Sequence, residues 1–167
     1  MIDPGLGKRN GEMVLREVAK VSRNAELFIA ASVRFVVVGP THTRGDTAFF
    51  VEGDNVLLAG DVVMKNSFVA ATGTSSMKAW LAAFDTLDAL KPRTIVPAHG
   101  EVGPGTIIAT NRSIMQGVQT RARALKAEGR TADETATTVQ AEFQAQHPGW
   151  PRANGAAAAQ SAFAEAP

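Results

Sequence analysis

Three short phrases of this chain each place a potential metal ligand directly after an apolar run that predicts a β-strand. Residues 41–46 read Thr-His-Thr-Arg-Gly-Asp, residues 59–61 read Ala-Gly-Asp, and residues 97–100 read Pro-Ala-His-Gly. Imidazole and carboxylate groups suit zinc and similar divalent ions, and the end of a strand holds a ligand with little backbone freedom. The chain has only three histidines, and two of them fall in these phrases. The pattern therefore predicts a metal site at the rim of a sheet.

The apolar runs before these phrases predict four strands of a mixed sheet. Residues 33–38 are mostly β-branched or aromatic, which is typical of a strand covered on both faces. Residues 47–52 and 56–60 flank the Gly-Asp-Asn tip at 53–55, a composition that favours a tight hairpin turn. Residues 94–97 predict one more short strand.

Helices are predicted on either side of the last strand and in the C-terminal part. Residues 77–90 and 104–128 carry apolar side chains at three- and four-residue spacing, which gives each helix one buried face. Thr131 and Glu134 have the spacing of a capping box that begins a further helix. Residues 156–164 predict a short terminal helix.

The three phrases also carry a resemblance to a known family. In hydrolases of the metallo-β-lactamase fold, a His-Thr-x-Gly-Asp loop, a strand ending in Gly-Asp and a strand ending in Pro-x-His-Gly occur in this order, and here they run over residues 39–100. The chain thus resembles the second half of that superfamily, which includes zinc β-lactamases, glyoxalase II-type thioesterases and lactonases. The resemblance implies an α/β fold, a partial or shortened αββα sandwich with helices on its outer faces.

The start of the chain extends the resemblance. Residues 1–5 resemble the Ile-Asp-x-Gly turn after an earlier strand of the family, and residues 12–21 resemble the helix that follows it. We therefore expect a single domain over all 167 residues. Its expected parts are a first strand and helix in residues 1–29, a second half with the ligand loops in residues 33–127, and a C-terminal helical extension in residues 131–167.

The strongest motif of the family, His-x-His-x-Asp-His, is absent from this sequence. No histidine precedes His42, and the chain passes from residues 26–29 through residues 30–32 directly into the run at 33–38. In the family this motif supplies most ligands of the first metal and one ligand of the second. The sequence therefore indicates a deleted, truncated or unrecorded segment near residues 30–32.

The resemblance implies a role for each candidate ligand. It places His42 on a first metal, Asp61 as the catalytic carboxylate that bridges two metals, and His99 on the second metal. Asp46 resembles a structural or second-shell carboxylate that orients the His-Thr-x-Gly-Asp loop. The implied cofactor is zinc, as one or two ions.

With the motif absent, these residues leave two ligands per ion, fewer than catalytic zinc sites hold. Two alternatives remain open: the three groups gather around one ion, or further ligands come from Asp3, His147 or a second subunit. Asp3 better fits a turn residue. His147 lies near a helix end, where a structural or surface role fits better.

The function implied by the resemblance is that of a zinc-dependent hydrolase. A metal-activated water would attack the carbonyl of an ester, thioester, lactone or β-lactam. The alternative is a non-catalytic truncated remnant or interaction module with weak or no metal binding. The substrate-binding residues stay open, although Met64 and Lys65, just after Asp61, lie where a substrate can reach.

The amino-acid composition limits the classes of molecule that we expect the chain to bind. The formal net charge is +1 and basic residues are spread along the chain, so neither nucleic acid nor an anionic membrane is an expected partner. A small-molecule substrate fits better. The absence of cysteine excludes disulfides and thiolate ligands.

Location and assembly follow from two further observations. Residues 1–25 lack the pattern of a secretion signal, and no apolar stretch is long enough to span a bilayer, so we expect a cytoplasmic protein. A missing half exposes sheet edges and apolar helix faces, which favours a homodimer or strand exchange.

Overall fold

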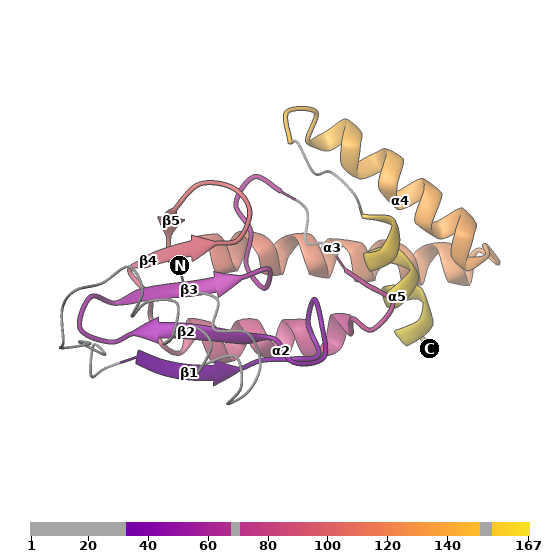
Figure 1. The fold of residues 1–167 in the computed structure, drawn as a ribbon. Helices are drawn as coiled ribbons and strands as arrows, with labels where there is room; N and C mark the ends of the chain where they lie inside the picture. The colour runs from indigo at the N-terminus through magenta and orange to yellow at the C-terminus, as the bar shows by residue number, and fades with distance from the viewer. Residues whose placement is uncertain (1–32, 68–70, 151–154) are drawn as a thin grey trace, which may run out of the picture. The chain divides into compact units, whose positions relative to one another are not determined.

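Five strands form one mixed sheet in which the strand order follows the chain, β1-β2-β3-β4-β5 (Figure 1). The computed structural model describes residues 33–67, 71–150 and 155–167, and this part of the chain belongs to one compact unit. The first strand and helix expected within residues 1–29 and the junction expected at residues 30–32 lie outside the described residues. The assignment of the whole chain to a single domain stays a prediction.

The first three strands form an antiparallel meander, of which the sequence predicts the hairpin of the second and third strands. They are β1 (Val33–Val37), β2 (Thr47–Val51) and β3 (Val56–Gly60). Phe35 of β1 lies opposite Phe49 of β2 in the register. The turn between β2 and β3 contains a residue in the left-handed region, with φ 58°, which is the conformation that a Gly-Asp-Asn tip accommodates.

A helical crossover then returns the chain to the same sheet. Helix α2 (Met77–Asp88) begins at Ser76, whose hydroxyl accepts a hydrogen bond from the amide of Ala79. Strand β4 (Thr94–Pro97) follows and pairs in parallel with β3. The two parallel strands therefore end at the same rim of the sheet, which is the relationship that positions the candidate site.

The long helix after β4 begins later than the sequence pattern predicts. Helix α3 (Ile107–Ala127) is preceded by β5 (Gly103–Pro104), which pairs antiparallel with β4. The expected start at residue 104 is therefore wrong. Pairing with β4 holds residues 103–104 in the sheet, and the Gly105 amide donates to the carbonyl of Arg93, so the helix begins only after this turn.

The two C-terminal helices match the prediction. Helix α4 (Ala132–Gln146) begins with the expected capping box, in which Thr131 and Glu134 exchange hydrogen bonds. Helix α5 (Ala156–Glu165) packs against α4 and α3. None of the helices in the described part of the chain is long and apolar enough to cross a membrane.

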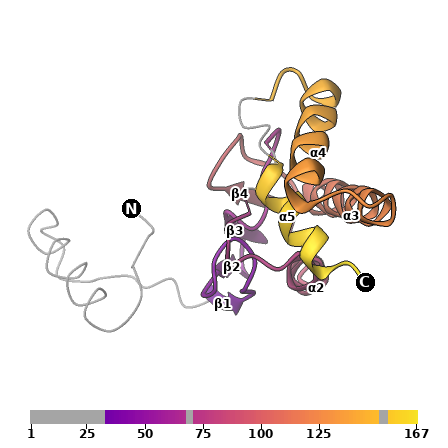
Figure 2. The same cartoon turned by 90° about the vertical axis from the view of Figure 1, so that its right-hand side faces the viewer.

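The described helices all lie on one face of the sheet (Figure 2). The core forms there, where alternate strand residues such as Leu57 and Ile95 meet Trp80 and Phe84 of α2, all of them fully buried. The expectation that β1 is covered on both faces is wrong for the described residues. Its second set of side chains faces away from the helices, and Phe35 remains 67% exposed.

Candidate functional site

Asp61 and His99 lie side by side at the rim where β3 and β4 end. The amide of Ala98 donates to the carbonyl of Gly60 over 2.9 Å, which aligns the two strand ends. Asp61 Oδ1 and His99 Nε2 are 3.2 Å apart, and each side chain is about one third exposed. The structure thus joins two of the three predicted ligands in one accessible pair.

Two glycines shape the strand ends that carry this pair. Gly60 precedes Asp61 with φ 56°, and Gly100 follows His99 with φ 91°, both in the region that favours glycine. A Cβ at Gly100 would lie 2.1 Å from the carbonyl oxygen of Lys65. The absence of a side chain at residue 100 therefore lets the chain after His99 pass close to the segment that follows Asp61.

The segment after Asp61 is anchored by two helices. The indole Nε1 of Trp80 donates to the carbonyl of Val62 over 2.9 Å. Asn111 Oδ1 accepts from the Met64 amide at 3.0 Å, and Asn111 Nδ2 donates to the Met64 carbonyl at 2.7 Å. Asn111 was not among the residues predicted from the sequence, although a polar residue on the apolar stripe of a helix was a usable signal.

These anchors correct one expectation about substrate access. Met64 is 1% exposed, because its backbone is held against α3 by Asn111, so its side chain is closed to a substrate. Lys65 remains partly open, and its Nζ lies 3.2 Å from Glu101 Oε2 and 3.3 Å from the carbonyl of Val102. This ion pair ties the segment after Asp61 to the loop after His99.

Asp46 organises the loop that contains His42. Its carboxylate accepts hydrogen bonds from the hydroxyls of Thr41 and Thr43, and from the amide of Thr43 over 2.8 Å. The carbonyl of His42 in turn accepts from the hydroxyl of Thr72. The carboxylate therefore orients the loop, and its role beside a metal stays a prediction.

The described residues do not form a metal site with three ligands. Within the part of the chain that the structure describes, no group of three or more His, Cys, Asp or Glu side chains is close enough to hold a metal ion. A carboxylate and an imidazole are suitable zinc donors, but a catalytic zinc needs three protein ligands. The set of His42, Asp61 and His99 as metal ligands thus stays a prediction, and Asp3 lies outside the described residues.

His147, the other proposed source of a ligand, belongs to an aromatic cluster at the end of α4. Its ring stacks on Trp150 with centroids 4.1 Å apart and lies 4.5 Å from the ring of Phe143. The cluster borders a groove of about 500 Å³ between α3 and α4. The lining of that groove includes neither Asp61 nor His99.

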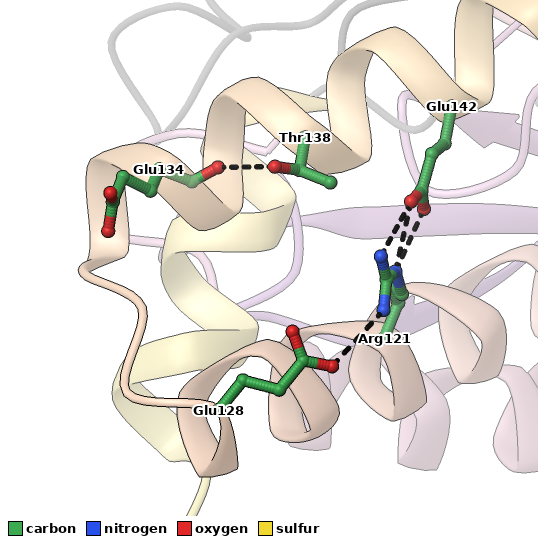
Figure 3. A network of polar contacts seen from close by, with 5 residues as sticks. All are labelled: Arg121, Glu128, Glu134, Thr138 and Glu142. Atoms are coloured by element: carbon green, nitrogen blue, oxygen red, sulfur yellow. Dashed lines mark hydrogen bonds and ion pairs between the residues drawn. The ribbon is translucent and has the colours of Figure 1, made fainter.

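The charged groups of this groove already pair with each other. Arg121 Nε and Nη2 donate to the carboxylate of Glu142 at 2.8–3.1 Å, and its Nη1 lies 3.9 Å from Glu128 (Figure 3). The hydrogen bonds with Glu142 raise the pKa of Arg121 above its usual value. Because these charges are already matched within the groove, we take the strand-end pair as the candidate functional site.

Comparison with known proteins bears on the fold of the chain. A profile of the metallo-beta-lactamase superfamily matches residues 30–99, which contain all three ligand phrases up to His99. A metallo-beta-lactamase family protein from Thermus thermophilus is 25% identical, with a TM-score of 0.57 over 85% of this chain and 46% of that protein. This chain has a partial metallo-β-lactamase fold. The α/β prediction and the resemblance to the superfamily are therefore confirmed.

Other solved structures are similar to this chain at lower identity. The stereoselective inverting sec-alkylsulfatase Pisa1 from Pseudomonas sp. is 16% identical, with a TM-score of 0.57 over 78% of this chain and 23% of the enzyme. A metallo-beta-lactamase from Pontibacter korlensis is 19% identical, with a TM-score of 0.46 over 63% of this chain and 55% of that protein. The chain spans about half the length of the first structures that it matches. No curated protein matches the sequence.

Proposed function

We propose that this metallo-β-lactamase-fold chain is a metal-dependent hydrolase that acts on a small ester, thioester, lactone or β-lactam. The observation that carries the proposal is the 3.2 Å approach of Asp61 and His99 at the ends of adjacent parallel strands. A carboxylate and an imidazole on rigid strand ends are donors of the type that zinc takes in hydrolases. Superfamily resemblance supports hydrolysis as the type of reaction.

The residues of this chain hold and orient the pair. Gly100 lets the chain after His99 pass close to the segment after Asp61, while Asn111 and Trp80 fix that segment. A zinc ion, when bound, supplies a water whose pKa is low enough to give a nucleophile near neutral pH. The described residues bring together two of the donors that such an ion needs, and not three.

The alternative function is that of a non-catalytic module with weak or no metal binding. One observation favours it: Asp61 and His99 contact each other directly, and no third acidic or histidine side chain joins them within the described residues. In this alternative the pair joins the ends of β3 and β4 as a polar contact. Such an exposed pair contributes little to stability.

Metal analysis of the purified full chain separates the two functions. We expect the wild type to bind zinc, to melt at a higher temperature with zinc than without it, and to hydrolyse p-nitrophenyl acetate. Asp61→Asn and His99→Gln should each lose zinc binding and activity. Asp54→Asn is the matched control, because Asp54 lies in the exposed turn between β2 and β3.

Two outcomes contradict the hydrolase. A wild-type chain that binds no zinc, shows no change in melting temperature with zinc and has no esterase activity supports the non-catalytic module. If both the Asp61→Asn and the His99→Gln variant still bind zinc, Asp61 and His99 are not the zinc ligands. A separate His42→Gln variant tests the third predicted ligand by the same zinc titration.

A further inference from the structure

The loop that contains His42 is anchored by the segment just before α2. The hydroxyls of Thr72 and Ser75 both donate to the carbonyl of His42, at 2.7 Å and 3.1 Å. A carbonyl oxygen has two lone pairs, and two hydroxyls reach this one. The amide of Ser76 also donates to the carbonyl of Pro40 over 3.3 Å. The backbone of His42 is therefore fixed by residues outside its own loop.

Ser75 is the residue that joins this anchor to the C-terminal helix. Its Oγ accepts from the amide of Thr72 over 2.7 Å, which leaves its one hydroxyl proton for the carbonyl of His42. The amide of Ser75 donates to the carbonyl of Thr72 over 3.0 Å. The carbonyl of Ser75 accepts from the hydroxyl of Ser161 on α5 over 2.9 Å. All polar groups of Ser75 thus take part in one network between the His42 loop and α5.

Helix α5 is held against the start of α2 at a second point. Glu165 Oε2 accepts from the amide of Lys78 over 2.9 Å, in a first turn that has no acidic residue of its own. A carboxylate is favoured there because the amides at the start of a helix lack intrahelical partners and carry partial positive charge. Lys126 Nζ of α3 donates to the carbonyl of Ala166 over 2.7 Å, which ties the end of α5 to α3. The C-terminal helix therefore braces the segment that anchors His42.

We propose that Ser75 is a positioning residue for His42, and that α5 supports it through Ser161. The inference rests on the proposed function, in which His42 is the third predicted ligand. A ligand on a fixed backbone has fewer orientations to lose when it binds, which is why a site needs support from the residues around it. Residues that orient a metal ligand typically change the affinity for the metal about 10- to 100-fold.

NMR spectroscopy of the full chain without metal tests the positioning directly. The chain has three histidines, so the imidazole signals of His99 and His147 serve as internal references for that of His42. We expect Ser75→Ala to shift the His42 signal and leave the other two in place. Amide exchange of residues 41–46 should become roughly five- to tenfold faster, as expected for the loss of one hydrogen bond.

Three further variants separate the hydroxyl of Ser75 from a general loss of structure. Ser75→Thr keeps a hydroxyl and should retain the wild-type His42 signal. Ser161→Ala should shift that signal in the same direction by a smaller amount, because Ser161 reaches the loop through Ser75. Ser113→Ala, at an exposed position of α3, is the matched control and should change nothing. Circular dichroism checks that each variant folds.

A zinc titration connects the positioning to the proposed site. We expect Ser75→Ala to raise the dissociation constant for zinc about tenfold, while Ser75→Thr and Ser113→Ala bind as the wild type does. If the wild type binds no zinc, the proposed hydrolase is wrong, and the NMR and exchange data still decide whether Ser75 positions His42. Those data are independent of metal.

Four results would overturn the inference. They are an unchanged His42 signal and loop exchange in Ser75→Ala, equal shifts of all three histidine signals, a Ser75→Thr variant that behaves as Ser75→Ala, and an unchanged zinc affinity of Ser75→Ala in a chain that His42→Gln deprives of zinc. The first and third would show that the hydroxyl does not hold the loop. The second would show a general structural change, and the fourth would show that the hold on His42 does not matter to the ligand.

Discussion

Asn111 of α3 holds both backbone polar groups of Met64, accepting from its amide at 3.0 Å and donating to its carbonyl at 2.7 Å. The side chain is 2% exposed, and it also donates to the carbonyl of Ile107 over 2.8 Å. A buried amide with these three bonds works as a clamp between the helix and the segment after Asp61. The position of Asp61 therefore depends on a residue of α3 far along the chain.

Replacement of Asn111 by alanine should destabilise the protein. The substitution leaves the buried amide and carbonyl of Met64 without partners, and each such loss costs about 1–3 kcal/mol. We expect the free energy of unfolding, measured by urea denaturation, to fall by roughly 2–4 kcal/mol. Gln116→Ala, at an exposed position of the same helix, is the control and should change it little. An Asn111→Ala variant as stable as wild type would show that the clamp contributes nothing.

Gly100→Ala should damage the strand end that carries His99. The left-handed backbone alone costs a non-glycine residue about 1–2 kcal/mol, and the new Cβ would collide with the carbonyl of Lys65. We expect a loss of more than about 1 kcal/mol in the free energy of unfolding by the same measurement. Gly73→Ala is the control, since a Cβ at Gly73 meets nothing within 4 Å. Equal stability of the two variants would contradict this account.

Gly117→Ala should stabilise the protein. Gly117 lies on an exposed position of α3, and a Cβ there meets nothing within 4 Å. Alanine in a helix interior is favoured over glycine by about 0.5–1 kcal/mol. Thermal and urea denaturation should both register the gain. A loss of stability would mean that the wall of the groove between α3 and α4 requires the glycine.

The capping box of α4 should make stability depend on pH in the acid range. The Thr131 amide donates to Glu134 Oε2 over 2.8 Å, and this bond, with that from the Thr131 hydroxyl, lowers the pKa of Glu134 from its usual 4.5. Because the folded pKa is the lower one, the stabilisation is complete above the unfolded pKa and is lost as pH falls through the folded value.

The measurement for the capping box is a comparison of wild type with Glu134→Gln. We expect the wild type to be the more stable at pH 7, and the difference in free energy of unfolding to shrink below about pH 4.5. Thr131→Ala should weaken the same pH dependence, because it removes the hydroxyl donor. A difference that stays constant down to about pH 3 would mean that the ionised carboxylate is not the stabilising form.

The local elements of this fold could be predicted from the sequence because each depends on residues close together in the chain. The β2–β3 hairpin, the capping box at Thr131 and the apolar stripe of α2 depend on neighbours within a few residues, and the structure has each of them. The start of α3 was predicted too early. The pairing of Gly103 and Pro104 with β4 delays the start of α3, and the apolar spacing of a helix carries no information about such strand pairing.

The candidate ligands were also recognisable as a set, because each follows a strand, but their arrangement was not. Asp61 and His99 meet because β3 and β4 pair in parallel and end at one rim, whereas within the described residues no three-ligand group forms. The direct contact of Asp61 with His99, together with the segment held by Asn111, depends on strand adjacency and helix placement. No pattern of nearby residues encodes such distances.

Residue order in this chain was sufficient to specify its hairpin, most of its helix starts and its apolar stripes, since these arise from interactions between close neighbours. Packing of distant segments decided which two of the candidate ligands touch, how Asn111 holds the segment after Asp61, and which face of the sheet receives helices. The apolar residues of β1 lie on both of its faces, so the sequence pattern does not indicate which face the helices cover. Only the placement of α2 to α5 on one side leaves Phe35 and Val37 open to solvent.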